Sequence, residues 1–195
     1  MRIFLETERL ILRRFTEADV DLLVGLDADP EVMRFLTGGR STPGAEIEHD
    51  LLPAIVSSYD RYAGYGRWAA IEKATGDFLG WFHLRPKSDG PPDEPWLGYR
   101  LRRAAWGQGY ATEGSRALIR KGFVDLGARL VLATTMAVNT ASRRVMEKAG
   151  LTLVRTFHQE WPDAIAGNEY GDVVYALDKT DWERQQVADA DTLSG

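Results

Sequence analysis

The chain has 195 residues, of which 44% are hydrophobic and 10% aromatic, enough for one domain with a substantial core. Cysteine is absent, which excludes disulfides, thiolate nucleophiles and sulfur-ligated zinc, and the three scattered histidines show no metal-ligand spacing, so we expect no metal. The net charge of -5 argues against a nucleic-acid partner, and the lack of an apolar run of ~18 residues argues against a membrane partner and for a cytoplasmic protein.

Charge is distributed unevenly along the chain. Residues 16–60 contain ten acidic and two basic residues, whereas residues 100–121 contain six basic residues and one acidic residue. The first segment suits a cationic partner and the second an anionic partner. Either segment is also explained as the solvated face of ordinary helices.

The amino-terminal part is predicted to be one strand followed by helices. Residues 9–15 alternate loosely between polar and apolar side chains, as a strand does. A capping box at residues 16–19 begins a helix that runs to about Ala28. Asp29-Pro30 begins a second short helix, and an apolar stripe over residues 43–62 predicts a longer one.

The rest of the chain mixes strands and helices. Residues 68–71 and 78–84 flank a turn at residues 74–77, which predicts a β-hairpin. Hydrophobic periodicity and the glycine and proline residues between segments predict four further strands and two helices. The strands lie at 96–101, 130–134, 151–158 and 172–177, and the helices at 109–124 and 140–149.

Strands joined through helices must run parallel, so the centre of the sheet needs a parallel pair. We therefore predict an α/β (α+β mixed) fold, with a mostly antiparallel sheet of about seven strands, a central parallel pair, and helices on both faces. One domain should span residues 1–182, and residues 183–195 should form a frayed tail.

The strongest chemical signal is the stretch Trp-Gly-Gln-Gly-Tyr-Ala-Thr-Glu at residues 106–113, between a strand and a helix. Gly107 and Gly109 let the backbone turn tightly, and the unpaired amides at the start of the helix can hold a phosphate. A tight turn between a strand and a helix also uses glycine for steric reasons alone, without any ligand. The stretch is neither a nucleotide-triphosphate loop nor a full dinucleotide-binding fingerprint.

Residues 106–111 resemble the Gln/Arg-x-x-Gly-x-Gly/Ala signature with which GNAT acetyltransferases hold the pyrophosphate of coenzyme A. Trp106 departs from the usual Gln or Arg, but Trp-Gly-x-Gly-Tyr-Ala-Thr-Glu is a usual form in the branch of the RimJ and RimL ribosomal-protein N-terminal acetyltransferases. Three more stretches are similar to that branch, so the resemblance covers nearly the whole chain: residues 6–13, 139–151 and 172–177.

The resemblance implies acetyl-CoA as the acetyl-donor cosubstrate. Two central strands of the family fold splay apart, and the pantetheine arm pairs with strand backbone there. The residues so assigned are Tyr99, Leu101 and Arg103 along the arm, Gly107, Gln108, Gly109, Tyr110, Ala111 and Thr112 around the pyrophosphate, and Asn139 and Ser142 beside the arm and the thioester sulfur. Asn139 is equally suited to be the N-cap of the following helix.

The resemblance also implies direct attack of a neutral amine on the thioester, without a covalent enzyme intermediate. Many members place an acidic tyrosine at the position of Met146, so Ser142, with Tyr99 behind it, is our candidate acid. Glu160 matches a carboxylate near the acceptor site of the branch and is the candidate base. Ser142 is also explained as a packed hydroxyl, and Glu160 as an exposed carboxylate at a strand end.

The free-energy cost of deprotonating the acceptor amine decides how strong a base the protein needs. At neutral pH, deprotonating an α-amino group of pKa ~8 costs about 1 kcal/mol, whereas a lysine of pKa ~10.4 costs roughly 4 kcal/mol. A modest base is therefore sufficient for an N-terminal substrate.

We predict an N-acetyltransferase whose acceptor is a primary amine, either a protein or peptide N-terminus or another cationic amine. Acetylation of a small molecule (an aminoglycoside, an amino acid or a polyamine) is the first alternative. A noncatalytic acyl-CoA-binding module is the second, which the missing tyrosine would suit. Dimers are frequent in the branch that the chain resembles, so a homodimer is a further expectation.

Overall fold

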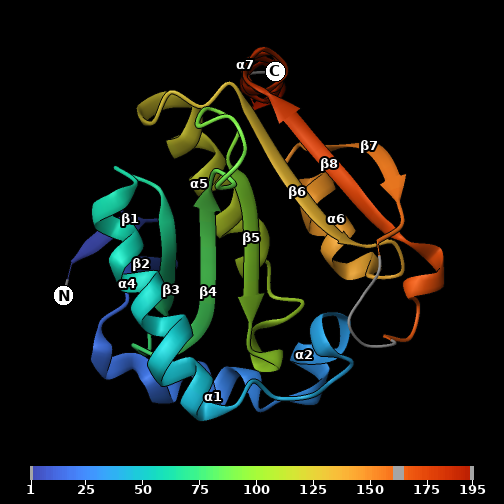
Figure 1. Ribbon diagram of the computed structural model, residues 1–195. Coiled ribbons are helices and arrows are strands. Elements are labelled where there is room, and N and C mark those ends of the chain that lie inside the picture. The colour runs from blue at the N-terminus through green and yellow to red at the C-terminus, as the bar shows by residue number, and fades with distance from the viewer. Residues whose placement is uncertain (1, 160–164, 194–195) are drawn as a thin grey trace.

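The computed structural model describes residues 2–159 and 165–193, which form one mixed sheet covered by helices (Figure 1). The strand order is β1-β2-β3-β4-β5-β6-β8-β7, and β5 and β6 are the parallel pair among otherwise antiparallel neighbours. The strands are β1 (Ile3–Glu6), β2 (Leu10–Arg14), β3 (Gly66–Glu72), β4 (Phe78–Arg85), β5 (Trp96–Leu101), β6 (Leu130–Met136), β7 (Thr152–Phe157) and β8 (Asp172–Asp178). The predicted mixed α/β fold is confirmed.

Helices cover both faces of the sheet (Figure 1). Helix α5 packs on β4 and β5, whereas α1 and α4 pack on β4 and β3 from the other side, and α6 contacts α5 and β6. The helices are α1 (Val20–Asp27), α2 (Pro30–Thr37), α3 (Gly44–Glu46), α4 (Leu52–Arg61), α5 (Tyr110–Asp125), α6 (Thr140–Lys148) and α7 (Lys179–Leu193).

The sheet has eight strands, so the prediction of about seven missed one. The additional strand is β1, which pairs with β2 at the outer edge of the sheet. Its Phe4 ring stacks on Trp68, with ring centroids 4.0 Å apart and nearly parallel planes. Four residues are too few to show a period of two, so tertiary stacking rather than local pattern fixes this strand.

The amino-terminal helices follow the predicted order with two local differences. The capping box is present, because the Asp19 carboxylate accepts the Thr16 amide at 2.8 Å, but the first turn after it is a 3-10 turn at residues 17–19. The predicted helix over residues 43–62 contains a π-turn at residues 47–51. Pro53 has no amide to donate, which explains why the hydrogen-bond ladder shifts just before it.

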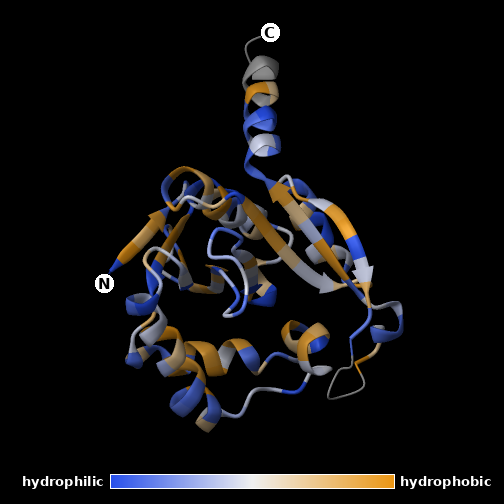
Figure 2. Cartoon of the chain, turned by 45° about the horizontal axis from the view of Figure 1, so that its top comes forward, coloured by the Kyte–Doolittle hydropathy of each residue, from blue (hydrophilic) through white to orange (hydrophobic). Residues whose placement is uncertain are grey.

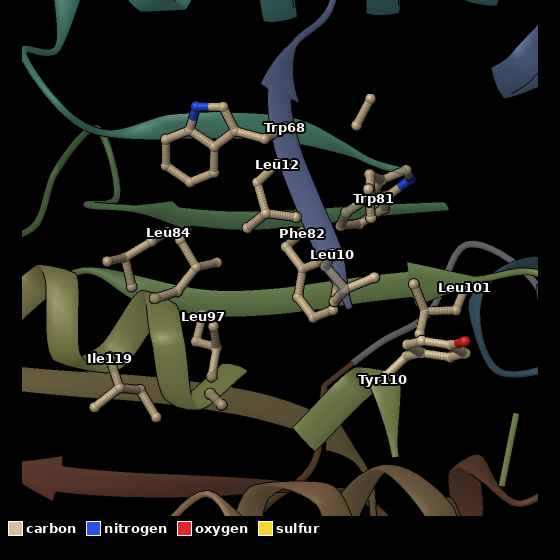
Figure 3. Close-up of a cluster of buried hydrophobic side chains, with 14 of the residues drawn as sticks. Leu10, Leu12, Trp68, Trp81, Phe82, Leu84, Leu97, Leu101, Tyr110 and Ile119 are labelled. Carbon is tan, nitrogen blue, oxygen red and sulfur yellow. The ribbon is translucent and has the colours of Figure 1, made fainter. Parts of the chain in front are cut away.

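The main core lies between the sheet and α5 (Figure 3). Leu12, Trp68, Phe82 and Leu84 on the strands meet the helix there, and all four are at most 1% exposed. This packing holds the beginning of α5 at a fixed position relative to β5.

Helix α7 lies in the range for which we predicted a frayed tail, and Figure 2 shows it extending away from the sheet. Its first turns are held by the body, because Trp182 packs near Phe123 at 5.4 Å between ring centroids and the Gln185 amide donates to the Gly150 carbonyl at 3.1 Å. A domain boundary near residue 182 stays a prediction. Over the described residues, no helix has the length and apolarity to cross a bilayer.

Candidate active site

The two parallel strands pair over a short stretch only. β5 and β6 meet at Trp96 and Leu132, where the Leu132 amide also donates to the Pro95 carbonyl at 3.0 Å, whereas β4 and β5 pair through six positions. Beyond this contact the two strands diverge (Figure 1). The backbone edge of β5 after Trp96 is therefore not paired with β6 in the register of the sheet.

Two predicted catalytic residues come together beside this divergence. The Tyr99 hydroxyl, on β5, lies 3.0 Å from the Ser142 hydroxyl and donates to the Ser142 carbonyl at 3.0 Å, so it joins the strand to the first turn of α6. Burial raises the pKa of Tyr99 to about 12, although the hydrogen bond with Ser142 opposes the increase. Tyr99 is therefore protonated at neutral pH and can act as a hydrogen-bond donor.

Asn139 is the N-cap of α6. Its side-chain oxygen accepts the Ser142 amide at 3.2 Å, and its side-chain nitrogen donates to the Thr135 hydroxyl at 3.1 Å. The capping role weighed from the sequence is therefore present, and it fixes the residue that meets Tyr99. A contact between Asn139 and the cofactor arm stays a prediction.

The glycine turn leads directly into α5. Gly107 and Gly109 have φ values of 73° and 86°, in the left-handed region that glycine adopts without strain, and Gly109 is the N-cap of the helix. Within the residues that the structure describes, the backbone amides of residues 107–112 have no protein acceptor. These amides are therefore available to an anion at a helix start.

Side chains close the turn without using those amides. The Trp106 indole donates to the Leu101 carbonyl at 2.8 Å, and the side-chain amide of Gln108 donates to the Ala104 carbonyl at 2.6 Å. A surface cavity of about 750 Å³ opens beside the turn and is lined by Gly109 and Thr112 and by three cationic side chains, Arg9, Arg116 and Lys148. Glu6, Glu8 and Glu113 also line the cavity, so its charged side chains are balanced, and the free amides and the dipole at the helix start are the features that suit a phosphate.

Glu113 ties the glycine turn to the first hairpin of the chain. Its carboxylate accepts the Thr7 hydroxyl at 2.6 Å, the Arg9 amide at 2.9 Å and the Arg9 guanidinium at 2.7 Å. The Arg9 guanidinium also donates to the Gln108 carbonyl at 3.0 Å and lies over the Tyr110 ring. We call this set the Glu113 clamp.

The sequence contained both halves of the clamp, at residues 6–13 and 106–113, but gave no sign that they touch. Arg9 and Glu113 were therefore not predicted as site residues from the sequence. They position the turn rather than contact a ligand by themselves. A pairing across about 100 positions can be found only from the folded chain.

The Glu113 clamp should stabilise the protein more at neutral than at acidic pH. Burial alone would raise the pKa of Glu113, but the hydrogen bonds from Thr7 and Arg9 outweigh it and lower the pKa below its usual value. The stabilisation is therefore present above the ordinary glutamate pKa and is lost as the pH falls through the lowered value.

We expect Glu113→Gln to reduce the free energy of unfolding at pH 7 by about 1–2 kcal/mol, a deficit that shrinks toward pH 3. Denaturant titrations across this pH range measure it. Asp125→Asn is the matched control, because Asp125 lies on the same helix with a half-exposed ion pair to Lys121. A deficit that does not vary with pH would contradict the role of the Glu113 charge.

Three of the predicted site residues stay predictions. The Leu101 side chain is 5% exposed and its carbonyl is used by Trp106, and Arg103 lies after β5, in a 3-10 turn at residues 103–105. Leu101 is the last residue of β5, and a contact of Leu101 or Arg103 with the cofactor arm stays a prediction. Glu160 lies outside the described residues. Among the described residues, no group of three or more acidic or histidine side chains could hold a metal ion.

Comparison with known proteins identifies the family of the chain. The family described as an acetyltransferase (GNAT) domain matches residues 9–152. A protein of Aspergillus fumigatus named FsC-acetyl coenzyme A-N(2)-transacetylase is 36% identical over 192 residues, covering 93% of this chain and 79% of its own length.

Solved structures of GNAT proteins have the same fold. A GNAT acetyltransferase from Bacillus anthracis superposes with a TM-score of 0.71 at 23% identity, over 92% of this chain and 99% of the other. A RimL ribosomal L7/L12 alpha-N-protein acetyltransferase in complex with coenzyme A gives 0.73 at 20% identity, over 91% and 98%. These chains share the fold, whereas the family match and the A. fumigatus relative establish membership. The chain belongs to the GNAT acetyltransferase family and is an acetyl-CoA-dependent N-acetyltransferase.

Proposed function

We propose that this protein acetylates an α-amino group, at the N-terminus of a peptide or protein, by direct transfer in a ternary complex. The observation that carries the proposal is the Tyr99–Ser142 hydroxyl pair beside the divergence of β5 and β6. A hydroxyl pair can donate a proton to a leaving thiolate, and removal of the ammonium proton then depends on a separate base. An α-amino group needs the least help to become neutral.

The residues fit the cofactor that the family uses. The free amides of residues 107–112 and the cations Arg116 and Lys148 would hold its phosphates, and the β5 edge after Trp96 would hold its arm. When bound, acetyl-CoA supplies an acetyl group activated as a thioester.

The chain's own residues then manage the protons. As the acceptor nitrogen replaces the sulfur on the acetyl carbon, the Ser142 hydroxyl would donate a proton to the departing sulfur. A proton from solvent would restore Ser142 through the Tyr99 hydroxyl, which is 3.0 Å away. We assign removal of the ammonium proton to Glu160, directly or through a water.

The acidic segment at residues 16–60 supports a cationic acceptor less than its charge suggests. Asp19 pairs with Arg13, Asp27 pairs with Arg100, and Asp29 caps α2. These three of the ten acidic residues are used by the fold, so the charge of the segment does not by itself establish a cationic acceptor.

A small α-amine is a second candidate acceptor, because the A. fumigatus relative carries a name that specifies transfer to an N(2) nitrogen.

A homodimer and a cytoplasmic location stay predictions. Light scattering of the purified protein tests the first and fractionation of the source cells the second.

Thioester consumption with acetyl-CoA and four acceptor classes tests the proposal: N-terminal peptides, free amino acids, polyamines and aminoglycosides. We expect α-amines to give the highest kcat/KM, and Glu160→Gln to lower kcat. Faster turnover of polyamines or aminoglycosides would contradict an α-amino acceptor. Calorimetric binding of coenzyme A without turnover of any amine would favour a noncatalytic module.

A further inference from the structure

A group of basic side chains lies on the face of the sheet that α1 covers. Arg67 on β3, His83 on β4 and Gly98 on β5 are paired across the three strands and form one row. Trp81 lies in the next row, and its ring has the Arg67 guanidinium carbon 4.2 Å from its centroid. We call Arg67 and His83, with Arg85 near them, the basic row.

The acidic residue beside the basic row, Asp27, already has two partners outside the row. Asp27, on α1, is 2% exposed, forms an ion pair with Arg100, and accepts the Thr42 hydroxyl at 2.6 Å. Asp27 acts on Arg67 through its charge, but its ion pair is with Arg100, and no carboxylate in the described part of the chain forms an ion pair with the basic row.

Arg67 is the unbalanced charge of the basic row. Among the residues that the structure describes, its guanidinium has no hydrogen bond or ion pair, and it lies over the Trp81 ring in a partly buried position. Burial, with repulsion from Arg85 and Arg100, lowers the pKa of Arg67 to about 9, although attraction to Asp27 opposes the decrease. An unpaired cation in such a place costs folding free energy, and a bound anion would recover it. Its side chain is still partly exposed, so a ligand can reach it.

His83 has an unused polar atom in the same place. Its Nδ1 is buried and has no partner in the described part of the chain. Burial and the charges of Arg67, Arg85 and Arg100 hold the pKa of His83 well below its usual value, so the ring is neutral. A neutral imidazole can still form a hydrogen bond with a ligand oxygen.

The basic row leads to the point where β5 and β6 diverge. The His83 ring lies against Gly98, where an added Cβ would be 2.6 Å from two ring atoms, so only glycine fits there. Gly98 precedes Tyr99, whose side chain meets Ser142 on the other face. Strands are ~4.8 Å apart, which puts Arg67 roughly 10 Å across the sheet from Gly98.

We propose that the basic row is an acceptor subsite in which Arg67, assisted by His83 and Arg85, binds a carboxylate carried by the amine substrate. This rests on the proposed function and narrows it to α-amines with a carboxylate within about one residue of the reacting nitrogen. The carboxylate is either the free α-carboxylate of an amino acid or an acidic side chain near a peptide N-terminus. The same guanidinium would recognise both.

Two pairs of acceptors distinguish these sources. Alanine against alaninamide tests the α-carboxylate, and Ala-Glu-Ala amide against Ala-Gln-Ala amide tests the side chain. We expect kcat/KM at least about tenfold higher for the carboxylate member of one pair, and Arg67→Gln to abolish that preference while leaving the KM for acetyl-CoA unchanged. Equal kcat/KM within both pairs in the unchanged protein would overturn the proposal.

Arg14→Gln is the matched control, because Arg14 also lies over an aromatic ring, 4.7 Å from the centroid of Tyr59, but on the opposite face of the sheet. It should keep the carboxylate preference.

If the unchanged protein acetylates no amine at all, the proposed function fails separately. Calorimetry with both acceptor pairs on coenzyme A-loaded protein then decides. Tighter binding of the carboxylate member of at least one pair, lost in Arg67→Gln, supports the subsite, and any other result overturns it.

Discussion

Ser142→Ala is expected to lower kcat about 100-fold, the lower end of what a positioned acid contributes, with little change in the KM for acetyl-CoA. The substitution removes the hydroxyl that lies 3.0 Å from Tyr99. It keeps the Ser142 carbonyl, which accepts the second Tyr99 hydrogen bond, and the amide that Asn139 caps. The fold around α6 should therefore survive, and steady-state kinetics measure a chemical loss.

Tyr99→Phe should also lower kcat, and the double variant should be little worse than Ser142→Ala, since two groups on one proton path act as a unit. Because the pKa of Tyr99 is raised to about 12, its ionisation should not shape the pH–rate profile below pH 10. Tyr65→Phe is the matched control: it also removes a hydroxyl that donates to a carbonyl, that of Leu126, far from the site. Losses that multiply in the double variant would contradict a shared path.

Gly109→Val is expected to raise the KM for acetyl-CoA about 100-fold. A side chain at φ 86° is strained, so the turn must rotate and move the amides of Gly109 and Tyr110 away from the phosphates. Loss of two charge-assisted hydrogen bonds is worth about 3 kcal/mol, which corresponds to roughly 100-fold in affinity. Calorimetry with coenzyme A measures the same change without turnover.

Gly76→Val is the control for strain alone. Gly76 has a φ of 78° in the turn between β3 and β4, and an added Cβ there meets no atom within 4 Å. Both variants should lose about 1–2 kcal/mol of stability, but only Gly109→Val should weaken cofactor binding. An unchanged affinity in Gly109→Val would remove these amides from the cofactor site.

Local patterns in the sequence were sufficient for most elements of the fold. The strand at 96–101, the hairpin around the turn at 74–77 and the helix after Gly109 are present as predicted, because period, capping and glycine act over a few residues. The parallel pair followed from the connections through helices alone.

The sequence by itself determined which residues could form the phosphate turn and which hydroxyls could act as acids. Only the tertiary structure decided that Tyr99 meets Ser142, that Glu113 joins the turn to the first hairpin, and that Arg67 is left without a carboxylate. These contacts join positions from 43 to 106 residues apart or depend on where Asp27 is used. Such pairings are set by the packing of the whole core, which has no local signature in the chain.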